Sequence, residues 1–286
     1  MLKRFSPVVV LLAAVLIALP ACGKKSAAPT VPDTTPAPIP APKPAPNQNQ
    51  GTGGTQTQPL DPSLPNPPTQ KPLFANVVAV AAIRDANMNN LKMIGLAFHN
   101  ANDTLGSFPM GIADKNGKVG LSWRVAILPF IEQDALYRAF KLDEPWDSEH
   151  NKKLISQMPK IYGPARTDTN GYTFYRSFSG KDTIMPTPTM ALTAGKVVPG
   201  VKMVAIPDGL SNTLFVAEAY DPVIWTKPDE LEFTPGKPPR LGGGVFNTGF
   251  CSLFGDGSAR FLPMNLTATE LSNLIQTNDG NIVNLP

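Results

Sequence analysis

The sequence predicts an α+β domain between residues 73 and 286, with one long N-terminal helix packed on an antiparallel β-sheet and additional short helices. Two observations predict this class. Apolar residues recur at helical spacing over residues 74–99, and beyond Pro159 the chain consists mainly of short β-prone runs separated by turn residues. A long helix followed by antiparallel strands is the element order of α+β folds.

The long helix is predicted from a single apolar stripe. Its members are spaced three, four or eight residues apart, and they are Val77, Val80, Met88, Leu91, Ile94 and Phe98. Arg84 interrupts the stripe and should either reach solvent along its aliphatic stem or find a partner. Pro72 suits a first helical turn, and the polar run at residues 100–103 is expected to end the helix.

Two shorter helices are expected next, at residues 131–140 and 148–158, the second with Ser148 as its N-cap. An irregular stretch beginning at residues 108–109 precedes them. Strands are then expected where β-branched and aromatic residues cluster, at residues 172–178, 202–206, 213–219, 250–254 and 258–262. Asp256-Gly257 joins the last two as a hairpin, and residues 266–276 form a terminal helix that starts near Thr267 or Thr269.

The first 21 residues have the pattern of a secretory signal peptide. Lys3 and Arg4 supply a positive start, and an apolar run of about a dozen residues follows, shorter than the roughly 20 that span a bilayer. The run ends at Leu19-Pro20-Ala21-Cys22, which resembles the lipobox of bacterial lipoproteins. We therefore expect cleavage before Cys22 and a lipid on its sulfur, rather than an ordinary secretory signal or an uncleaved anchor.

Residues 22–72 are expected to form a disordered tether between the lipid and the domain. Residues 23–72 contain 14 prolines, and a Gln/Asn/Gly/Thr tract occupies residues 47–58. Such a segment has too few apolar side chains to offset the entropy of ordering, and its Pro-Ala repeats favour polyproline II. A proline-rich ligand for a peptide-binding domain is the alternative. Gly23, where Asp would signal retention in the inner membrane, favours the outer membrane, with the domain facing the periplasm or the exterior.

Charge and cysteine content narrow the functions to consider. Residues 73–286 carry 19 Lys and Arg against 20 Asp and Glu, so the domain is nearly neutral, which argues against a nucleic-acid partner. Cys251 is the only cysteine besides Cys22, so no intramolecular disulfide is expected. The fold must then rest on its hydrophobic core.

Several blocks across the domain resemble the DUF1559 family of unknown function, which is abundant in planctomycete-type bacteria. These blocks are residues 89–92, 94–97, 99–100, 106–109, 121–125, 128–129, 131–133, 143–147, 208–209, 211–213, 225–228 and 256–258. The resemblance implies a pseudopilin-like domain, and members of the family are sometimes labelled as solute-binding. This chain departs from the family's prepilin-type start, because a lipobox and a tether stand there, so assembly into a pilin-type filament is not expected.

Catalysis is not expected. A Ser-His-Asp arrangement would have to use His99 or His150 with a serine such as Ser122 or Ser211, and no G-x-S-x-G motif is present. The two histidines and Cys251 are too few and too scattered for a zinc site, so no cofactor is expected. Acidic residues cluster around Trp146, as in many glycosidases, and they are Asp143, Glu144, Asp147 and Glu149. They suit a helix N-terminus better, with Trp146 in the core.

Two weak binding candidates remain. Asp256 and Asp279 could contribute to a calcium site, although no D-x-D-x-D-G loop is present. Trp123, Trp146 and Trp225 could line a sugar or peptide groove with Arg124 or Lys227 converging on it, and Trp225 is the tryptophan expected to be exposed if such a groove exists. The sequence thus predicts a lipid-anchored binding or scaffolding protein of the cell envelope, with extracytoplasmic solute binding as the alternative and an envelope hydrolase as a third reading.

Overall fold

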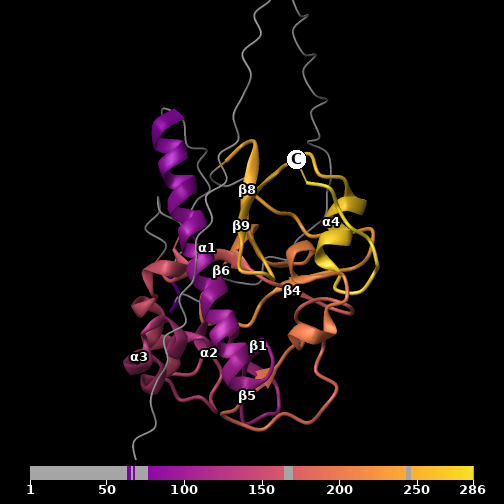
Figure 1. The fold of residues 1–286 in the computed structure, drawn as a ribbon. Coiled ribbons are helices and arrows are strands. Elements are labelled where there is room, and N and C mark those ends of the chain that lie inside the picture. The colour runs from indigo at the N-terminus through magenta and orange to yellow at the C-terminus, as the bar shows by residue number, and fades with distance from the viewer. Residues whose placement is uncertain (1–62, 66, 68–76, 164–169, 243–245, 286) are drawn as a thin grey trace, which may run out of the picture. The chain divides into compact units, whose positions relative to one another are not determined.

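The computed structural model describes residues 63–65, 67, 77–163, 170–242 and 246–285 (Figure 1). The predicted signal peptide, Cys22 and the predicted tether up to residue 62 lie outside the described residues. The described residues belong to one compact unit, Gln58–Pro286. None of the helices that they form is both long enough and apolar enough to cross a membrane.

The long helix α1 spans Val77–Leu105. Leu91, Ile94 and Phe98 from the predicted stripe are buried, which confirms the helix and its inner face. The predicted end at residues 100–103 is wrong, because buried Ala101 continues the stripe for another turn. Gly106, at a φ of 79°, then closes the helix by donating its N–H to the carbonyl of Asn102, as C-terminal glycines commonly do.

Arg84 on α1 both reaches solvent and finds a partner, the two outcomes expected for an arginine within the apolar stripe. Its side chain is 45% exposed and lies 3.6 Å from the carboxylate of Asp85. Its guanidinium also stands 5.7 Å from the centre of the Phe261 ring, so the stem covers apolar surface while the charge stays near solvent.

The main sheet is antiparallel and has the strand order β3-β6-β8-β9. Its strands are β3 (Tyr172–Arg176), β6 (Leu214–Ile224), β8 (Gly249–Phe254) and β9 (Ala259–Pro263). Helix α1 lies against β8 and β9 (Figure 1). Gly95 permits this approach, because a Cβ there would stand 2.8 Å from a methyl of Leu253. A long helix on an antiparallel sheet confirms the predicted α+β class.

The predicted hairpin joins β8 to β9. Asp256 accepts a hydrogen bond from the backbone N–H of Ser258 through its carboxylate, and Gly257 adopts a φ of 81°. The turn therefore uses the aspartate to hold the backbone two residues further on and the glycine to supply a positive φ, as Asp-Gly hairpins do.

A second sheet, of order β2-β1-β5, was not predicted. It contains β1 (Pro109–Ala113) and β2 (Val119–Ser122), where the sequence indicated an irregular stretch, and β5 (Val197–Pro199), where no element was expected. These strands carry prolines and glycines in place of alternating apolar residues. Gly111 is required there, because a Cβ would lie 2.3 Å from the carbonyl oxygen of Leu121.

The other strand predictions need two corrections. Residues 202–206 form no strand but contain the 3-10 turn η4 (Met203–Ala205), in which Val204 is 92% exposed, so β-branched residues there do not mark a buried strand. The predicted strand at residues 172–178 is divided into β3 and β4 (Phe178–Ser179), and β4 pairs in parallel with β7 (Leu231–Glu232). A further 3-10 turn, η5, spans Leu210–Asn212.

Each of the two short helices predicted from the sequence is replaced by shorter helical segments, several of them 3-10 helices. The expected helix at residues 131–140 is η1 (Leu128–Ile131) followed by α3 (Asp134–Ala139), and α2 (Trp123–Ala126) precedes them. The expected helix at residues 148–158 is the 3-10 helix η2 (Asn151–Gln157), followed by η3 (Lys160–Tyr162). The N-cap of η2 is His150 and not Ser148 as predicted, although the Ser148 hydroxyl accepts a hydrogen bond from the N–H of Asn151. Helix α4 (Ala268–Ile275) begins with a capping box formed by Thr267 and Glu270.

The core is strongly aromatic. Phe98 lies 5.0 Å from Trp123 between ring centres, and Phe108 meets Phe215 edge to face at 4.7 Å. Tyr162 stacks on Trp225 at 5.9 Å. Cys251 is a free, buried thiol, and burial raises its pKa well above the ordinary value. The contacts between the aromatic rings stabilise the fold beyond the free energy gained by burying the rings.

Candidate functional site

Trp123 and Trp225, the tryptophans expected to line a groove, have no exposed surface. The indole N–H of Trp225 donates to the carbonyl of Ile155 at 2.9 Å, and its backbone N–H donates to the carbonyl of Gly171 at 3.0 Å. The expectation that Trp225 is exposed is therefore corrected: its ring is core, and its polar atoms connect η2 to the start of β3.

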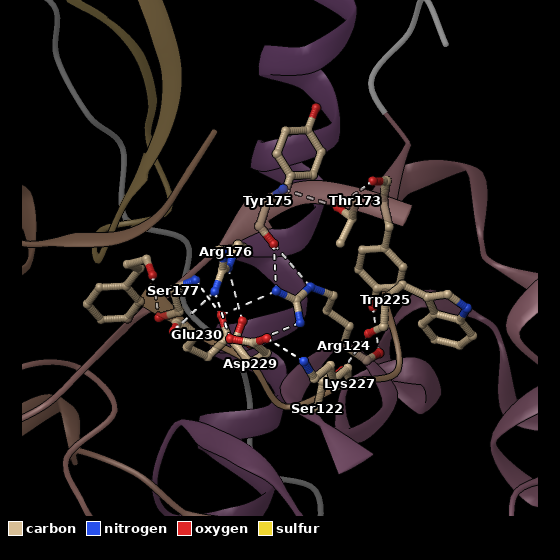
Figure 2. Close-up of polar contacts among 12 residues, drawn as sticks. Ser122, Arg124, Thr173, Tyr175, Arg176, Ser177, Trp225, Lys227, Asp229 and Glu230 are labelled. Carbon is tan, nitrogen blue, oxygen red and sulfur yellow. Dashed lines mark hydrogen bonds and ion pairs between the residues drawn. The ribbon is translucent and has the colours of Figure 1, made fainter. Parts of the chain in front are cut away.

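Arg124 is also buried, with no exposed surface, and it lies at the centre of a polar network (Figure 2). Two of its guanidinium nitrogens donate to the backbone carbonyl of Tyr175, at 3.0 and 2.8 Å. The guanidinium also donates to both carboxylate oxygens of Glu230, at 2.9 and 3.2 Å. Burial lowers the pKa of Arg124 from its ordinary value, while the Glu230 carboxylate opposes that shift.

A second pair of charges continues this network toward the surface. Asp229 accepts from Arg176 at 2.9 Å and from Lys227 at 2.6 Å, so Lys227 bonds to a neighbouring carboxylate. Burial alone would raise the pKa of Asp229, but the hydrogen bond from Lys227 and the nearby positive charges outweigh it and lower the pKa. Glu230 also accepts from the backbone N–H of Ser177 at 2.6 Å. Figure 2 shows these side chains converging, with the ring of Tyr175 pointing away.

The network joins two of the blocks that carry the family resemblance. The hydroxyl of Ser122 donates to the carbonyl of Trp225 at 2.6 Å, and the N–H of Ser122 donates to the carbonyl of Thr226 at 3.0 Å. Ser122, considered as a nucleophile from the sequence, is thus a buried hydrogen-bond donor to the backbone. The network is a structural cross-link between the start of α2, β3 and residues 225–230.

The histidines considered for catalysis bond to the backbone. His99 lies with Nε2 2.9 Å from the carbonyl oxygen of Gly255, and His150 with Nε2 2.7 Å from that of Ala139. Each contact ties its helical segment to a neighbouring turn or helix. Neither contact joins an imidazole to a serine or a carboxylate, and Ser211 is exposed on η5.

The expectation that the acidic cluster around Trp146 suits a helix N-terminus is corrected, because η2 begins at Asn151 with no acidic residue in its first turn and no side-chain cap. Hydrogen bonds from Ser148 and Lys141 lower the pKa of Glu144. Trp146 is half-buried against the core, and the Lys227 ammonium lies 5.9 Å from the centre of its ring. Glu144 is thus held by hydrogen bonds, and Trp146 packs against the core.

The two aspartates considered for calcium are held in separate turns. Asp256 stabilises the β8-β9 hairpin and lies 3.5 Å from the guanidinium of Arg260, while Asp279 accepts from the backbone N–H of Asn281 and from the Gln276 amide. Across residues 77–163, 170–242 and 246–285, no three Asp, Glu, His or Cys side chains gather as a metal site would require.

A groove beside η2 is the feature of the described surface that sequence reasoning missed. It has a volume of about 680 Å³, and its lining includes Lys152, Ile155, Met158 and Gly171 as well as Ser63-Leu64-Pro65. We call it the η2 groove. Trp225 holds two of its walls in place through the bonds to Ile155 and Gly171 described above. No pattern singled out from the sequence indicated it.

The base of η2 is fixed by Asn151, which is buried. Its side-chain amide donates to the carbonyls of Lys141, Glu144 and Pro145, and its side-chain oxygen accepts from the N–H of Lys141. A side chain with all these bonds has one orientation. The groove is therefore built on a rigid support.

A family model described as a protein of unknown function, DUF1559, matches residues 81–238, which is more than half of the chain. This chain belongs to the DUF1559 family. No curated protein and no solved structure matches the chain. The DUF1559 match covers the Arg124 network and η2, whereas residues 63–65 and the β8-β9 hairpin lie outside it. The pseudopilin-like architecture stays a prediction.

Proposed function

We propose that this DUF1559 protein is a lipid-anchored protein of the cell envelope whose domain binds a protein or peptide ligand and performs no catalysis. The η2 groove is the observation that carries the binding role. Its volume of about 680 Å³ lies within the range of known ligand sites, roughly 300–1,000 Å³. Its walls combine lysines and hydroxyls with apolar side chains, which suits a ligand that has both a backbone to hydrogen-bond and side chains to bury.

The choice of a peptide over a sugar rests on where the aromatic rings lie. Sugar sites commonly present the faces of aromatic rings, but Trp123 and Trp225 are buried in the core, and the half-buried Trp146 is not among the residues that line the groove. The apolar residues that line the groove, Ile155 and Met158, are aliphatic. Solute binding therefore remains the second candidate, supported by the groove's volume alone.

The lipid anchor is proposed from the sequence at residues 19–22 and places the domain at a membrane, the outer membrane being favoured by Gly23. Changing Cys22→Ser should move the protein out of the membrane fraction and remove the mass of the acyl chains. If the variant stays in the membrane with unchanged mass, the anchor is disproved.

Ligand binding is tested by thermal unfolding of the full chain in detergent micelles, against sugars, amino acids, short peptides, and calcium with and without chelator. A ligand at a hundredfold excess over its Kd stabilises the folded state by about 2.7 kcal/mol, which raises the midpoint by a few degrees. A shift with peptides alone supports the proposal. A shift with sugars alone would replace it with solute binding. No shift with any compound, in the wild type or in a folded Leu64→Asp variant, would contradict ligand binding.

A further inference from the structure

Part of the predicted tether lines the η2 groove. Ser63, Leu64 and Pro65, which we call the strap, form one wall of the groove. Leu64 is half-buried and packs against the main hydrophobic core, and the hydroxyl of Ser63 accepts a hydrogen bond from the Lys152 ammonium at 3.2 Å. Pro67, two residues beyond the strap, is exposed. The contact is therefore centred on Leu64.

The part of the groove wall that lies outside the strap is supported by the fold. Gly171 lies so close to Ile155 that a Cβ on it would stand 2.5 Å from a methyl of Ile155, and Trp225 bonds to the carbonyls of both residues. A leucine-sized side chain thus meets walls that already have their shape. Binding to such a preformed site requires ordering of the incoming segment alone.

The strap is a segment that loses little conformational entropy when it is bound. Pro62 and Pro65 flank Ser63 and Leu64, and a proline restricts both its own backbone and that of the residue before it. Less entropy is lost when such a segment is held, so one half-buried leucine and one hydrogen bond from an ammonium suffice for a weak contact.

We propose that the η2 groove is a recognition site for Leu-Pro segments and that the strap occupies its leucine seat in cis. The inference rests on the proposed binding function and names the ligand class. The strap is joined to α1 by residues 66–76, and a connection of that length holds it at an effective concentration on the order of millimolar. A Leu-Pro segment added in trans must compete with that concentration, so the wild-type groove binds it weakly.

The test uses a fluorescent peptide with the sequence of residues 61–67 and the full chain in detergent micelles. Polarisation is measured for the wild type, for Leu64→Asp, which removes the strap from its seat, and for Pro67→Asp, which places the same charge on an exposed neighbour. Leu64→Asp should bind the peptide at least tenfold more tightly than the wild type and Pro67→Asp. A peptide with Asp in place of Leu should bind none of the three.

Hydrogen exchange provides an independent measurement. Residues 151–158 should exchange faster in Leu64→Asp than in the wild type, and added peptide should restore their protection, which also shows that the variant is folded. If Leu64→Asp does not fold, Leu64→Ala replaces it with the same expectations. Equal affinity for all chains, or no binding to a folded Leu64 variant, would overturn the inference. If the ligand panel still yields a stabilising peptide in that case, the proposed binding function stands without the strap.

Discussion

Arg124 and Glu230, 106 residues apart in the chain, form a two-point ion pair inside the domain, with nitrogen–oxygen distances of 2.9 and 3.2 Å. Their side chains are 0% and 7% exposed, so water cannot replace either partner. Each residue also satisfies a backbone group, since Arg124 donates to the Tyr175 carbonyl and Glu230 accepts from the Ser177 N–H. The pair thereby connects α2, β3 and the segment before β7.

Removing one partner of this pair should lower the free energy of unfolding strongly, whereas removing both partners together should lower it by less than the sum of the two single changes. Arg124→Met leaves a buried carboxylate without its counter-charge, and we expect a loss of about 3–5 kcal/mol in the free energy of unfolding. Arg124→Met with Glu230→Leu should lose clearly less than the sum of the two single changes, because no lone charge is left. Urea unfolding at pH 7 measures all three.

Lys227→Met is the control for that series. The Lys227–Asp229 pair has side chains 41% and 42% exposed, so its loss should cost no more than about 1 kcal/mol. Strict additivity of the Arg124 and Glu230 changes would show that the pair is not coupled.

Acid should weaken the outer part of the network through Asp229. Its pKa lies below the ordinary value of 3.8, so the folded state holds the carboxylate charged more strongly than the unfolded state does. This contribution is complete at pH values above 3.8 and is lost as the pH falls through the lower, folded-state pKa. Asp229→Asn should therefore flatten the fall in the unfolding midpoint between pH 5 and pH 2, as measured by circular dichroism. An unchanged pH profile would contradict this assignment.

Thr267 should matter to helix α4 and Thr269 should not. The Thr267 hydroxyl accepts from the backbone N–H of Glu270, and the Glu270 carboxylate accepts from the N–H of Thr267. Thr267→Ala should cost about 1 kcal/mol in the free energy of unfolding. Thr269→Ala, the matched change at an exposed position inside the helix, should be neutral or slightly stabilising because alanine favours helices. Equal effects would argue against the capping box.

A comparison of Gly171→Ala with Gly106→Ala distinguishes the free energy lost to backbone strain from the free energy lost to close packing. Both glycines have φ values near +80°, where a Cβ costs about 1–2 kcal/mol. A Cβ at Gly106 would meet nothing within 4 Å, whereas one at Gly171 would stand 2.5 Å from Ile155 Cγ2 and 3.0 Å from its carbonyl oxygen. Gly171→Ala should therefore cost about 1–3 kcal/mol more than Gly106→Ala and loosen the η2 groove. Denaturant unfolding gives the difference, and equal losses would show that Ile155 moves aside freely.

The elements predicted well are those whose signal is local. The stripe on α1, the Asp256-Gly257 turn and the Thr267 cap each lie within a few residues, and the structure has all three. The strands of the β2-β1-β5 sheet carry no such pattern. Their pairing depends on glycine at residue 111, whose role becomes visible only when the carbonyl of Leu121 is brought beside it.

The site residues show the same limit. Arg124, Lys227 and Trp225 were singled out from the sequence as members of a ligand groove, but Arg124 and Trp225 are buried and Lys227 pairs with Asp229 at the surface. Glu230 and the Tyr175 carbonyl were missed, because no spacing rule connects residues so far apart in the chain. Leu64 was placed in the tether on composition, which says nothing about where one leucine packs.

The sequence by itself determined the α+β class, the family, the neutrality of the domain and the expectation of a lipid at Cys22. These follow from composition and from patterns within a few residues, where helix periodicity, turn chemistry and the entropy of proline-rich segments operate. Only the tertiary structure decided that two tryptophans and an arginine are buried, that η2 carries a groove, and that Leu64 lies against it. Such facts depend on which distant segments meet, because burial and charge pairing arise from contacts in space and not from order along the chain.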